Sequence, residues 1–285
     1  MNNSNYIVAD SGTTKTDWCL VQNNEVKLSF RTAGFNPFFI NTGFIINELN
    51  SVFSEKFDAK CIESVFFYGA GCSSPERCNI VSEGLTAVFS KAVISIDTDL
   101  IAVARALFPA DEGIAVILGT GSNSCYCKNG IILNKFNSLG YVLGDEGSGN
   151  HMGKKLLKAY LESCLPPFLH QRFEKAIRME APEILDQIYR KPMPNRFLAS
   201  FSTFIRENIT DDFCRYLVID CFTEFFKHNL CKYPGYQDLT ISYSGSIAWN
   251  FRQELVHVAQ NHKTVTGKII ASPIIGLTNY HKNIF

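Results

Sequence analysis

Two short turns in the sequence combine glycine with hydroxyl side chains, which is the composition of a phosphate-binding loop. The stretch "DSGTTKTDW" begins at Asp10, directly after the apolar run "YIVA", and "GTGSNS" begins at Gly119, after "GIAVIL". Glycine lets backbone N–H groups approach anionic oxygens, and nearby hydroxyls add further donors. An ordinary polar turn with a local cap at Asp10 has the same composition, so the first turn alone does not decide between the two.

The two turns lie in segments that repeat. Gly119 follows Gly12 by 107 positions, and the same interval carries Asn23 onto Gly130. Each segment is predicted as strand, polar turn, strand, two-residue turn and strand. The sequence therefore predicts a duplicated unit whose polar turns clamp a triphosphate between them. The side-chain donors expected for this clamp are Ser11, Thr13, Thr14, Thr120, Ser122 and Asn123.

Neither of the two commonest phosphate loops explains these turns. The chain contains no GxxxxGK[ST] motif, and "GTGSNS" is followed by the strand-like "CYCKNGIIL", where a dinucleotide-binding loop requires a helix. Asp10 would repel phosphate, but a carboxylate at the end of a strand can hold hydrated Mg²⁺. Lys15 can offset phosphate charge.

Helices are predicted between the strands, which favours an α/β fold. The segment "DLIAVARALF" places Leu100, Val103, Ala104 and Leu107 on one face. "GKKLLKAYLESCL" follows the turn "GDEGSGN", and its expected apolar face is Leu157, Tyr160, Leu161 and Cys164. Residues 168–235 are expected to be mainly helical. Near the end, the strand "DLTISYSGS" leads into the helix "IAWNFRQELVHVAQ", whose expected inward residues are Ala248, Phe251, Leu255, Val258 and Ala259.

Composition restricts the remaining possibilities. A chain of 285 residues favours two domains, and 27 basic residues balance 27 acidic ones, which disfavours nucleic acid and membrane as partners. The N-terminus resembles no secretory signal, so we expect a soluble, cytoplasmic protein. Ten cysteines in a reducing compartment are expected to be free thiols, and Cys125, Cys127, Cys214, Cys221 and Cys231 are expected to be core residues rather than metal ligands.

Five motifs in this order, "DSGTTKTDW", "DLIAVARAL", "GTGSNS", "GDEGSG" and "SGSIAWNF", resemble the N-acetylglucosamine kinase group of the BadF/BadG/BcrA/BcrD-type ATPase family over nearly the whole chain. That family is related to acetate and sugar kinases, heat-shock chaperones and actin. The resemblance implies two ribonuclease-H-like (actin-like ATPase) domains with a nucleotide cleft between them. We place the first domain at 1–110, joined by the C-terminal segment 274–285, and the second at 111–273.

The resemblance assigns residues to ATP and Mg²⁺. It implies that the phosphates bind to two loops and the adenosine to the turn after a late strand, with magnesium served by Asp10 and, through water, by Asp145. The residues matched to the phosphates are Gly12, Thr13, Thr14, Lys15, Gly119, Thr120, Gly121 and Ser122. Those matched to adenosine are Gly245, Ser246 and Asn250.

The family's catalytic aspartate precedes an alanine-rich helix, which places it at Asp99, with Asp97 as its rival. Such a carboxylate accepts the proton of the sugar hydroxyl during phosphoryl transfer. Asp99 would also suit the N-cap of this helix, a role that is compatible with catalysis, and spacing does not separate it from Asp97.

The sugar-binding residues implied by the resemblance are Asn36, Asp99, Gly140 and Asp145. Asn36 precedes Pro37 and would also suit a plain turn, and Glu146 would suit a helix start. Leu139 departs from the aromatic residue that these kinases can carry before the glycine, which leaves the pocket for an acetamido group less secure.

The resulting hypothesis is an ATP-dependent kinase that phosphorylates an amino sugar, N-acetylglucosamine first, at its 6-hydroxyl. Oligomeric state stays open, a homodimer included. One alternative is a family ATPase that activates a dehydratase through an iron–sulfur cluster, but Val116, Ile117 and Leu118 occupy the positions before Gly119 where a cluster cysteine would lie. The other is a non-enzymatic binding protein switched by ATP.

Overall fold

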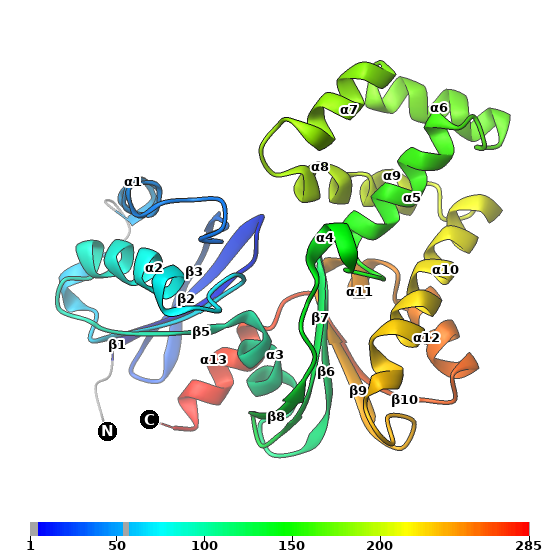
Figure 1. Cartoon of the computed structure of the whole chain (residues 1–285). Coiled ribbons are helices and arrows are strands. Elements are labelled where there is room, and N and C mark those ends of the chain that lie inside the picture. Colours follow the sequence, from blue (N-terminus) through cyan, green and yellow to red (C-terminus); the bar gives the residue numbers. More distant parts are fainter. Residues whose placement is uncertain (1–4, 54–56, 285) are drawn as a thin grey trace. The chain divides into compact units, whose positions relative to one another are not determined.

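The computed structural model describes residues 5–53 and 57–284, and the chain divides into two compact units (Figure 1). The first unit comprises Met1–Asp111, Lys128–Ile132 and Ser272–Phe285, and the second comprises Glu112–Cys127 and Leu133–Ala271. Each unit contains a five-stranded sheet with helices. The predicted α/β class is therefore confirmed.

The first sheet has the strand order β3-β2-β1-β4-β5. Its central strand β1 pairs antiparallel with β2 and parallel with β4, which in turn pairs parallel with β5. The elements of this unit are β1 (Asn5–Ser11), β2 (Lys15–Gln22), β3 (Glu25–Ala33), α1 (Thr42–Phe53), a 3-10 turn (Ala59–Cys61), β4 (Ser64–Gly69), α2 (Pro75–Val88), β5 (Val93–Thr98), α3 (Asp99–Leu107) and α13 (Ile274–Lys282).

Strand β1 is buried on both faces of its sheet. Ile7 and Ala9 pack in the cluster that contains α1 and α2. Tyr6 and Val8 pack in the cluster that contains α3 and α13. Because side chains alternate along a strand, Asp10 continues the second set and lies on the face of α3 and α13. The only polar side chains of this central strand are therefore near its ends.

The second sheet has the order β10-β9-β6-β7-β8, and β6 pairs parallel with β9, as β9 does with β10. The elements of this unit are β6 (Glu112–Leu118), β7 (Ser122–Lys128), β8 (Ile131–Lys135), α4 (Gly140–Leu143), α5 (Gly149–Leu161), α6 (Pro167–Ile177), α7 (Ala181–Tyr189), α8 (Pro194–Ser200), α9 (Ser202–Glu207), α10 (Asp212–His228), a 3-10 turn (Leu230–Lys232), β9 (Thr240–Ser244), α11 (Ser246–Asn250), α12 (Arg252–Asn261) and β10 (Val265–Ile270). The predicted helical middle of the chain is confirmed.

The predicted duplication is confirmed in the strands. Adding 107 to the bounds of β1 gives the bounds of β6, and the two sheets share one order of strands. The two-residue turns also correspond, since Asn23, Asn24, Asn129 and Gly130 all have positive φ. These turns are related by 106 positions rather than 107, because β7 is one residue shorter than β2.

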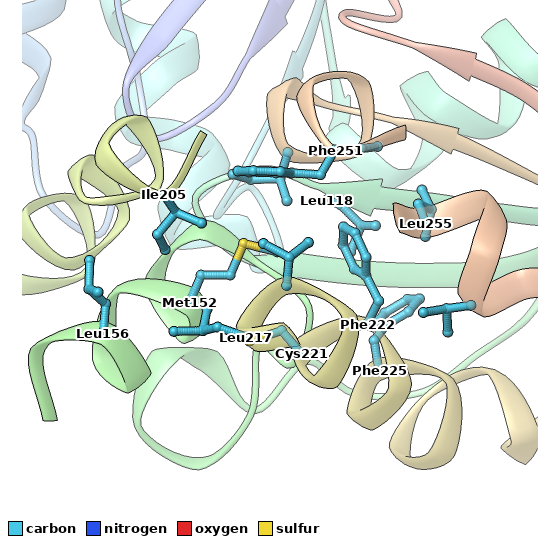
Figure 2. Close-up of a cluster of buried hydrophobic side chains, with 14 of the residues drawn as sticks. Leu118, Met152, Leu156, Ile205, Leu217, Cys221, Phe222, Phe225, Phe251 and Leu255 are labelled. Carbon is cyan, nitrogen blue, oxygen red and sulfur yellow. The ribbon is translucent and has the colours of Figure 1, made fainter. Parts of the chain in front are cut away.

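Helices and strands of the second unit enclose its core, part of which Figure 2 shows. Leu118, the last residue of β6, lies in this cluster together with residues of α5, α10 and α12. All ten cysteines are free thiols, as expected. Four of the five expected core cysteines are buried, whereas Cys231 is exposed at the surface, so its assignment to the core was wrong.

Helix α5 differs from the prediction in both its start and its buried face. It begins at Gly149, where the Ser148 side chain accepts a hydrogen bond from the His151 N–H, whereas the sequence predicted a start at Gly153. Its N-terminal half is buried because it packs against α8 and α10, while Leu161 and Cys164 are exposed. The apolar face predicted from periodicity therefore starts too close to the C-terminal end of the helix.

The helix predicted after β9 is two helices, α11 and α12, which meet at Phe251. The five residues expected to point inward are all buried. Among the described residues, no helix combines the length and apolar character needed to span a bilayer.

Gly153 permits the close packing of α5 on α8, because a Cβ at this position would overlap the carbonyl oxygen of Leu198. Gly153→Ala should therefore destabilise the protein by about 1–3 kcal/mol, although alanine favours helices. The matched control is Gly43→Ala in α1, where a Cβ makes only an ordinary contact, and this variant should lose no stability. Thermal unfolding measures both changes, and equal melting temperatures for the two variants would contradict the packing of α5 on α8.

Candidate functional site

The first glycine and hydroxyl loop, residues 12–14, is the turn between β1 and β2. The Gly12 N–H donates to the Lys15 carbonyl oxygen at 2.9 Å, which closes the turn. Thr13 is partly exposed and Thr14 is exposed. Both threonine side chains therefore lie where a ligand can reach them.

Ser11 does not belong to this accessible set. It is fully buried, its Oγ accepts the Phe35 N–H at 2.9 Å, and it lies 2.8 Å from the Thr16 Oγ1. The expectation that Ser11 offers its hydroxyl to phosphate is wrong, because that hydroxyl holds the following loop against the strand.

Three carboxylates lie near the end of β1. Asp10 and Asp17 are direct partners across the β1–β2 hairpin, and Asp99 is the first residue of α3. Burial, with the charges of Asp99 and Asp17, raises the pKa of Asp10 to about 7, although Lys15 and Ser272 oppose part of this shift. This concentration of negative charge is one that a bound cation would relieve.

Asp17 binds the lysine at the end of the first loop. Its Oδ2 accepts hydrogen bonds from the Lys15 Nζ at 2.7 Å and from the Ser272 Oγ at 3.1 Å, and its Oδ1 accepts one from the Arg31 Nε at 2.7 Å. Burial alone would raise the pKa of Asp17, but the hydrogen bonds from Lys15 and Arg31 hold it below its ordinary value. Counted outward from the turn at residues 12–15, the β1–β2 register places Asp17 opposite Asp10.

The two candidate bases have different surroundings. Asp97, at the end of β5, accepts a hydrogen bond from the Arg105 Nη1 at 2.9 Å, and the same Nη1 donates to the Tyr68 hydroxyl at 2.5 Å. Asp99 does not cap α3, because Thr98 is the N-cap and its Oγ1 accepts the N–H two residues after Asp99. Asp97 is thus engaged in an ion pair with Arg105, while Asp99 is close enough to Asp10 to raise the pKa of Asp10.

Asn36 lies at the predicted sugar loop and is 8% exposed. Its Nδ2 donates to the Thr13 Oγ1 at 3.0 Å, and its Oδ1 accepts the Phe38 N–H at 3.1 Å. The second of these bonds is the turn contact expected of an asparagine before proline. The first joins the predicted sugar loop to the first phosphate loop.

The second glycine and hydroxyl loop, residues 119–121, connects β6 to β7 and is fixed against α5. The Gly119 N–H donates to the Gly121 carbonyl oxygen at 3.0 Å. Two N–H groups at the start of α5, those of Gly149 and Asn150, donate to the carbonyl oxygens of Gly119 and Thr120 at 2.9 and 3.1 Å. The start of this helix therefore orients the loop.

Asp145 lies against the second loop with a left-handed backbone, φ 63°. Its Oδ1 accepts the Ser122 N–H at 3.1 Å, and its Oδ2 accepts the Asn150 Nδ2 at 2.8 Å. A Cβ on Gly121 would meet the Asp145 carboxylate at 2.9 Å, so glycine is needed there. Burial raises the pKa of Asp145 even though these two hydrogen bonds oppose the shift. Asn150 is a site residue that the sequence did not reveal.

The predicted adenosine turn follows β9. Gly245 has φ 121°, and a Cβ there would overlap the Leu118 carbonyl oxygen, so only glycine fits. Ser246 begins α11, and Asn250 ends it with an exposed side chain whose Oδ1 lies 3.5 Å from the Arg206 Nη1. The close backbone packing expected at Gly245 is therefore present.

Gly140, matched to the sugar pocket, begins the short helix α4 with φ 71°, and its surroundings leave room for a Cβ. Leu139 precedes it and is 60% exposed. The residue that departs from the family pattern therefore lies at the surface.

The donor chemistry of the described residues fits magnesium that arrives with a nucleotide. No cluster of three or more His, Cys, Asp or Glu side chains among residues 5–53 and 57–284 is arranged to hold a metal by itself. Asp10 in the first unit and Asp145 in the second are each a single carboxylate, of the kind that Mg²⁺ binds together with water and substrate phosphates. Asn150 adds a buried Oδ1 with no hydrogen-bond partner in the described chain.

Cys125, the cysteine nearest after the second loop, is 0% exposed in β7. A cluster ligand shared between subunits would have to reach the surface. This position therefore gives no support to the iron–sulfur alternative.

Comparison with solved structures relates this arrangement to known proteins. A candidate N-acetylglucosamine kinase from Porphyromonas gingivalis shares 36% identity, with 98% of this chain and 99% of that chain covered and a TM-score of 0.90. A candidate N-acetylglucosamine kinase from Chromobacterium violaceum shares 15% identity over 97% and 98% of the chains, with a TM-score of 0.69. A glucokinase of the ROK family from Streptomyces griseus, solved with glucose and AMPPNP, shares 12% identity over 97% and 98%, with a TM-score of 0.53. No protein-family model and no curated protein matches the sequence.

The chain belongs to the sugar kinase group of the actin-like ATPases. The first similarity is high enough in identity and coverage to show the family, and the more distant ones show the same fold. The resemblance found in the motifs is thereby confirmed, as are the two actin-like domains that it implied.

The raised pKa of Asp10 predicts a pH-dependent stability. Between pH 4 and 7 the folded protein keeps a proton on Asp10 that the unfolded chain releases, so this residue lowers stability progressively as the pH rises through that range. Asp10→Asn should raise the melting temperature of the metal-free protein at pH 8, and this gain should shrink toward pH 4. Thermal unfolding in the presence of a chelator measures it, and a gain that is equal at both pH values would refute the assignment.

Proposed function

We propose that the protein is an ATP-dependent amino-sugar kinase that transfers the γ-phosphoryl group of ATP to the 6-hydroxyl of N-acetylglucosamine or a near relative such as glucosamine, N-acetylmannosamine or a muramic sugar. One observation carries the proposal: the carboxylate of Asp99, at the start of α3, lies within charge interaction of Asp10 beside the Gly12–Thr14 loop. A base and a magnesium-holding carboxylate next to a phosphate loop are the parts that phosphoryl transfer requires.

Asp99 acts as the base. Its carboxylate takes the proton of the sugar hydroxyl as that oxygen forms a bond to the γ-phosphorus, and the bond from phosphorus to the bridging oxygen of ADP breaks. The sugar phosphate and ADP are the products. Asp97 is held by Arg105 at 2.9 Å and serves the fold of the β5–α3 connection.

The two glycine and hydroxyl loops hold the phosphates of the same nucleotide. Gly12, Thr13, Thr14 and Lys15 supply donors from the first unit, and the loop from Gly119 to Ser122 supplies donors from the second. Asp10 and Asp145 would hold Mg²⁺ through water, and the metal would supply positive charge to the phosphate oxygens. The turn at Gly245, Ser246 and Asn250 would receive the adenosine.

N-acetylglucosamine is the first choice of acceptor because the relative with 36% identity is a candidate kinase for that sugar. Asn36, Asp99, Gly140 and Asp145 are the residues proposed for the sugar. An asparagine amide both donates and accepts hydrogen bonds, which suits hydroxyl and acetamido groups.

Release of ADP across a panel of amino sugars tests the proposal, with Asp99→Asn and Asp97→Asn as matched variants. Asp99→Asn should lower kcat by about 10²- to 10⁴-fold, because it removes the proton acceptor, and should leave the KM for ATP nearly unchanged. Asp97→Asn should keep most turnover and lose about 0–1 kcal/mol of stability, since its ion pair with Arg105 is partly exposed.

Two results would contradict this account. An active Asp99→Asn beside an inactive Asp97→Asn would reverse the assignment of the base. Turnover that no sugar in the panel increases would reject the kinase and favour a protein that is switched by ATP.

A further inference from the structure

The loop after β3 is bonded directly to the first phosphate loop, within the first unit. The Gly34 N–H donates to the Thr14 carbonyl oxygen at 3.2 Å, and the Phe35 N–H donates to the Ser11 Oγ at 2.9 Å. A Cβ on Gly34 would overlap the backbone at Gly12 and Thr13, so the two segments pass in backbone contact. A residue of the 34–38 loop that binds the sugar can therefore also affect the position of the Gly12–Thr14 loop.

Asn36 provides the side-chain link between these segments. Its Nδ2 lies 3.0 Å from the Thr13 Oγ1. The Phe38 N–H fixes the orientation of the amide, because it must face the Oδ1 at 3.1 Å. With the amide fixed this way, Asn36 presents only N–H groups to Thr13.

The direction of the Thr13 hydrogen bond follows from this orientation. An amide nitrogen donates and does not accept, so the Thr13 Oγ1 is the acceptor. The Thr13 hydroxyl has one hydrogen, and it donates that hydrogen to no other residue in the part of the chain that the structure describes. The hydrogen is left for an acceptor outside the protein.

A phosphate oxygen is such an acceptor. Without Asn36, the Thr13 hydroxyl could turn its hydrogen toward a protein oxygen or water and present a lone pair to the phosphate instead. We infer that Asn36 is a positioning residue for the nucleotide: it makes Thr13 a donor toward an ATP phosphate, in addition to any contact that Asn36 makes with the sugar. This inference rests on the proposed function, because it takes the Gly12–Thr14 loop as a phosphate site.

The test is a cycle of variants, with ATP and adenosine bound in the absence of sugar. Asn36→Asp keeps an acceptor for the Phe38 N–H but can no longer donate to Thr13, and Thr13→Val removes the hydroxyl. Each single variant should weaken ATP binding about tenfold or more and leave adenosine binding unchanged, because a hydrogen bond to a charged phosphate is lost.

The double variant separates the role through Thr13 from other effects. In the Thr13→Val background, changing Asn36 to Asp should weaken ATP binding by less than about a third of the fold-change seen with Thr13 present. Asn36→Leu repeats the cycle without an added charge, and Thr13→Ser, which keeps a hydroxyl, should retain wild-type ATP affinity. Titration calorimetry gives the affinities, and melting temperatures identify variants that fail to fold.

ATP affinity within twofold of wild type in both Asn36 variants would overturn the inference and leave Asn36 with the sugar alone, seen then as a raised KM for sugar. An Asn36 effect of the same size with and without the Thr13 hydroxyl would also overturn it. A wild-type protein that binds no ATP would instead reject the proposed function itself, so the two failures are distinguishable.

Discussion

Burial of the central strands on their sheets is the constraint on which the rest of the structure depends. In β1, alternate residues from Tyr6 to Ala9 pack into two separate clusters, and Asp10 is the first charged side chain of the strand. In β6 the buried residues are Ile114, Ala115, Val116 and Leu118. Polar chemistry is thereby confined to the ends of these strands, where the turns to β2 and β7 carry the glycine and hydroxyl loops.

The two duplicated units differ in the carboxylates that lie near their glycine and hydroxyl loops. Adding 107 to Asp10 gives Ile117, so the second unit has a glycine and hydroxyl loop but no carboxylate at the matching position of its strand. It carries Asp145 instead, which reaches the loop from the turn before α5. The charges of Asp99 and Asp17 add to burial in raising the pKa of Asp10. Strongly shifted pKa values of this kind cluster at functional sites.

The sequence predicted the features that follow from local patterns. Strand alternation, two-residue turns and the 107-residue interval were sufficient for β1 to β3, β6 to β8 and β9, but β4, β5 and β10 were not predicted. The motif order was sufficient for the family. The sequence did not reveal that Ser11 is buried, because that depends on a contact with Phe35 from a later segment. It also did not reveal that Asn150 holds Asp145, because that depends on the left-handed backbone at Asp145 in the turn before α5. Helix α5 began earlier than predicted for a related reason: its polar first turn, with Asn150 and His151, is buried by tertiary contacts that periodicity does not register.

The product of the reaction is the sharpest test of phosphoryl transfer to an amino sugar. The wild-type protein is mixed with Mg-ATP and N-acetylglucosamine, and the phosphorus-containing products are identified by ³¹P NMR with coupling to the sugar protons. The account predicts a phosphate ester at the 6-position, formed in equal amount to ADP. Formation of inorganic phosphate and ADP with the sugar left unchanged would contradict it.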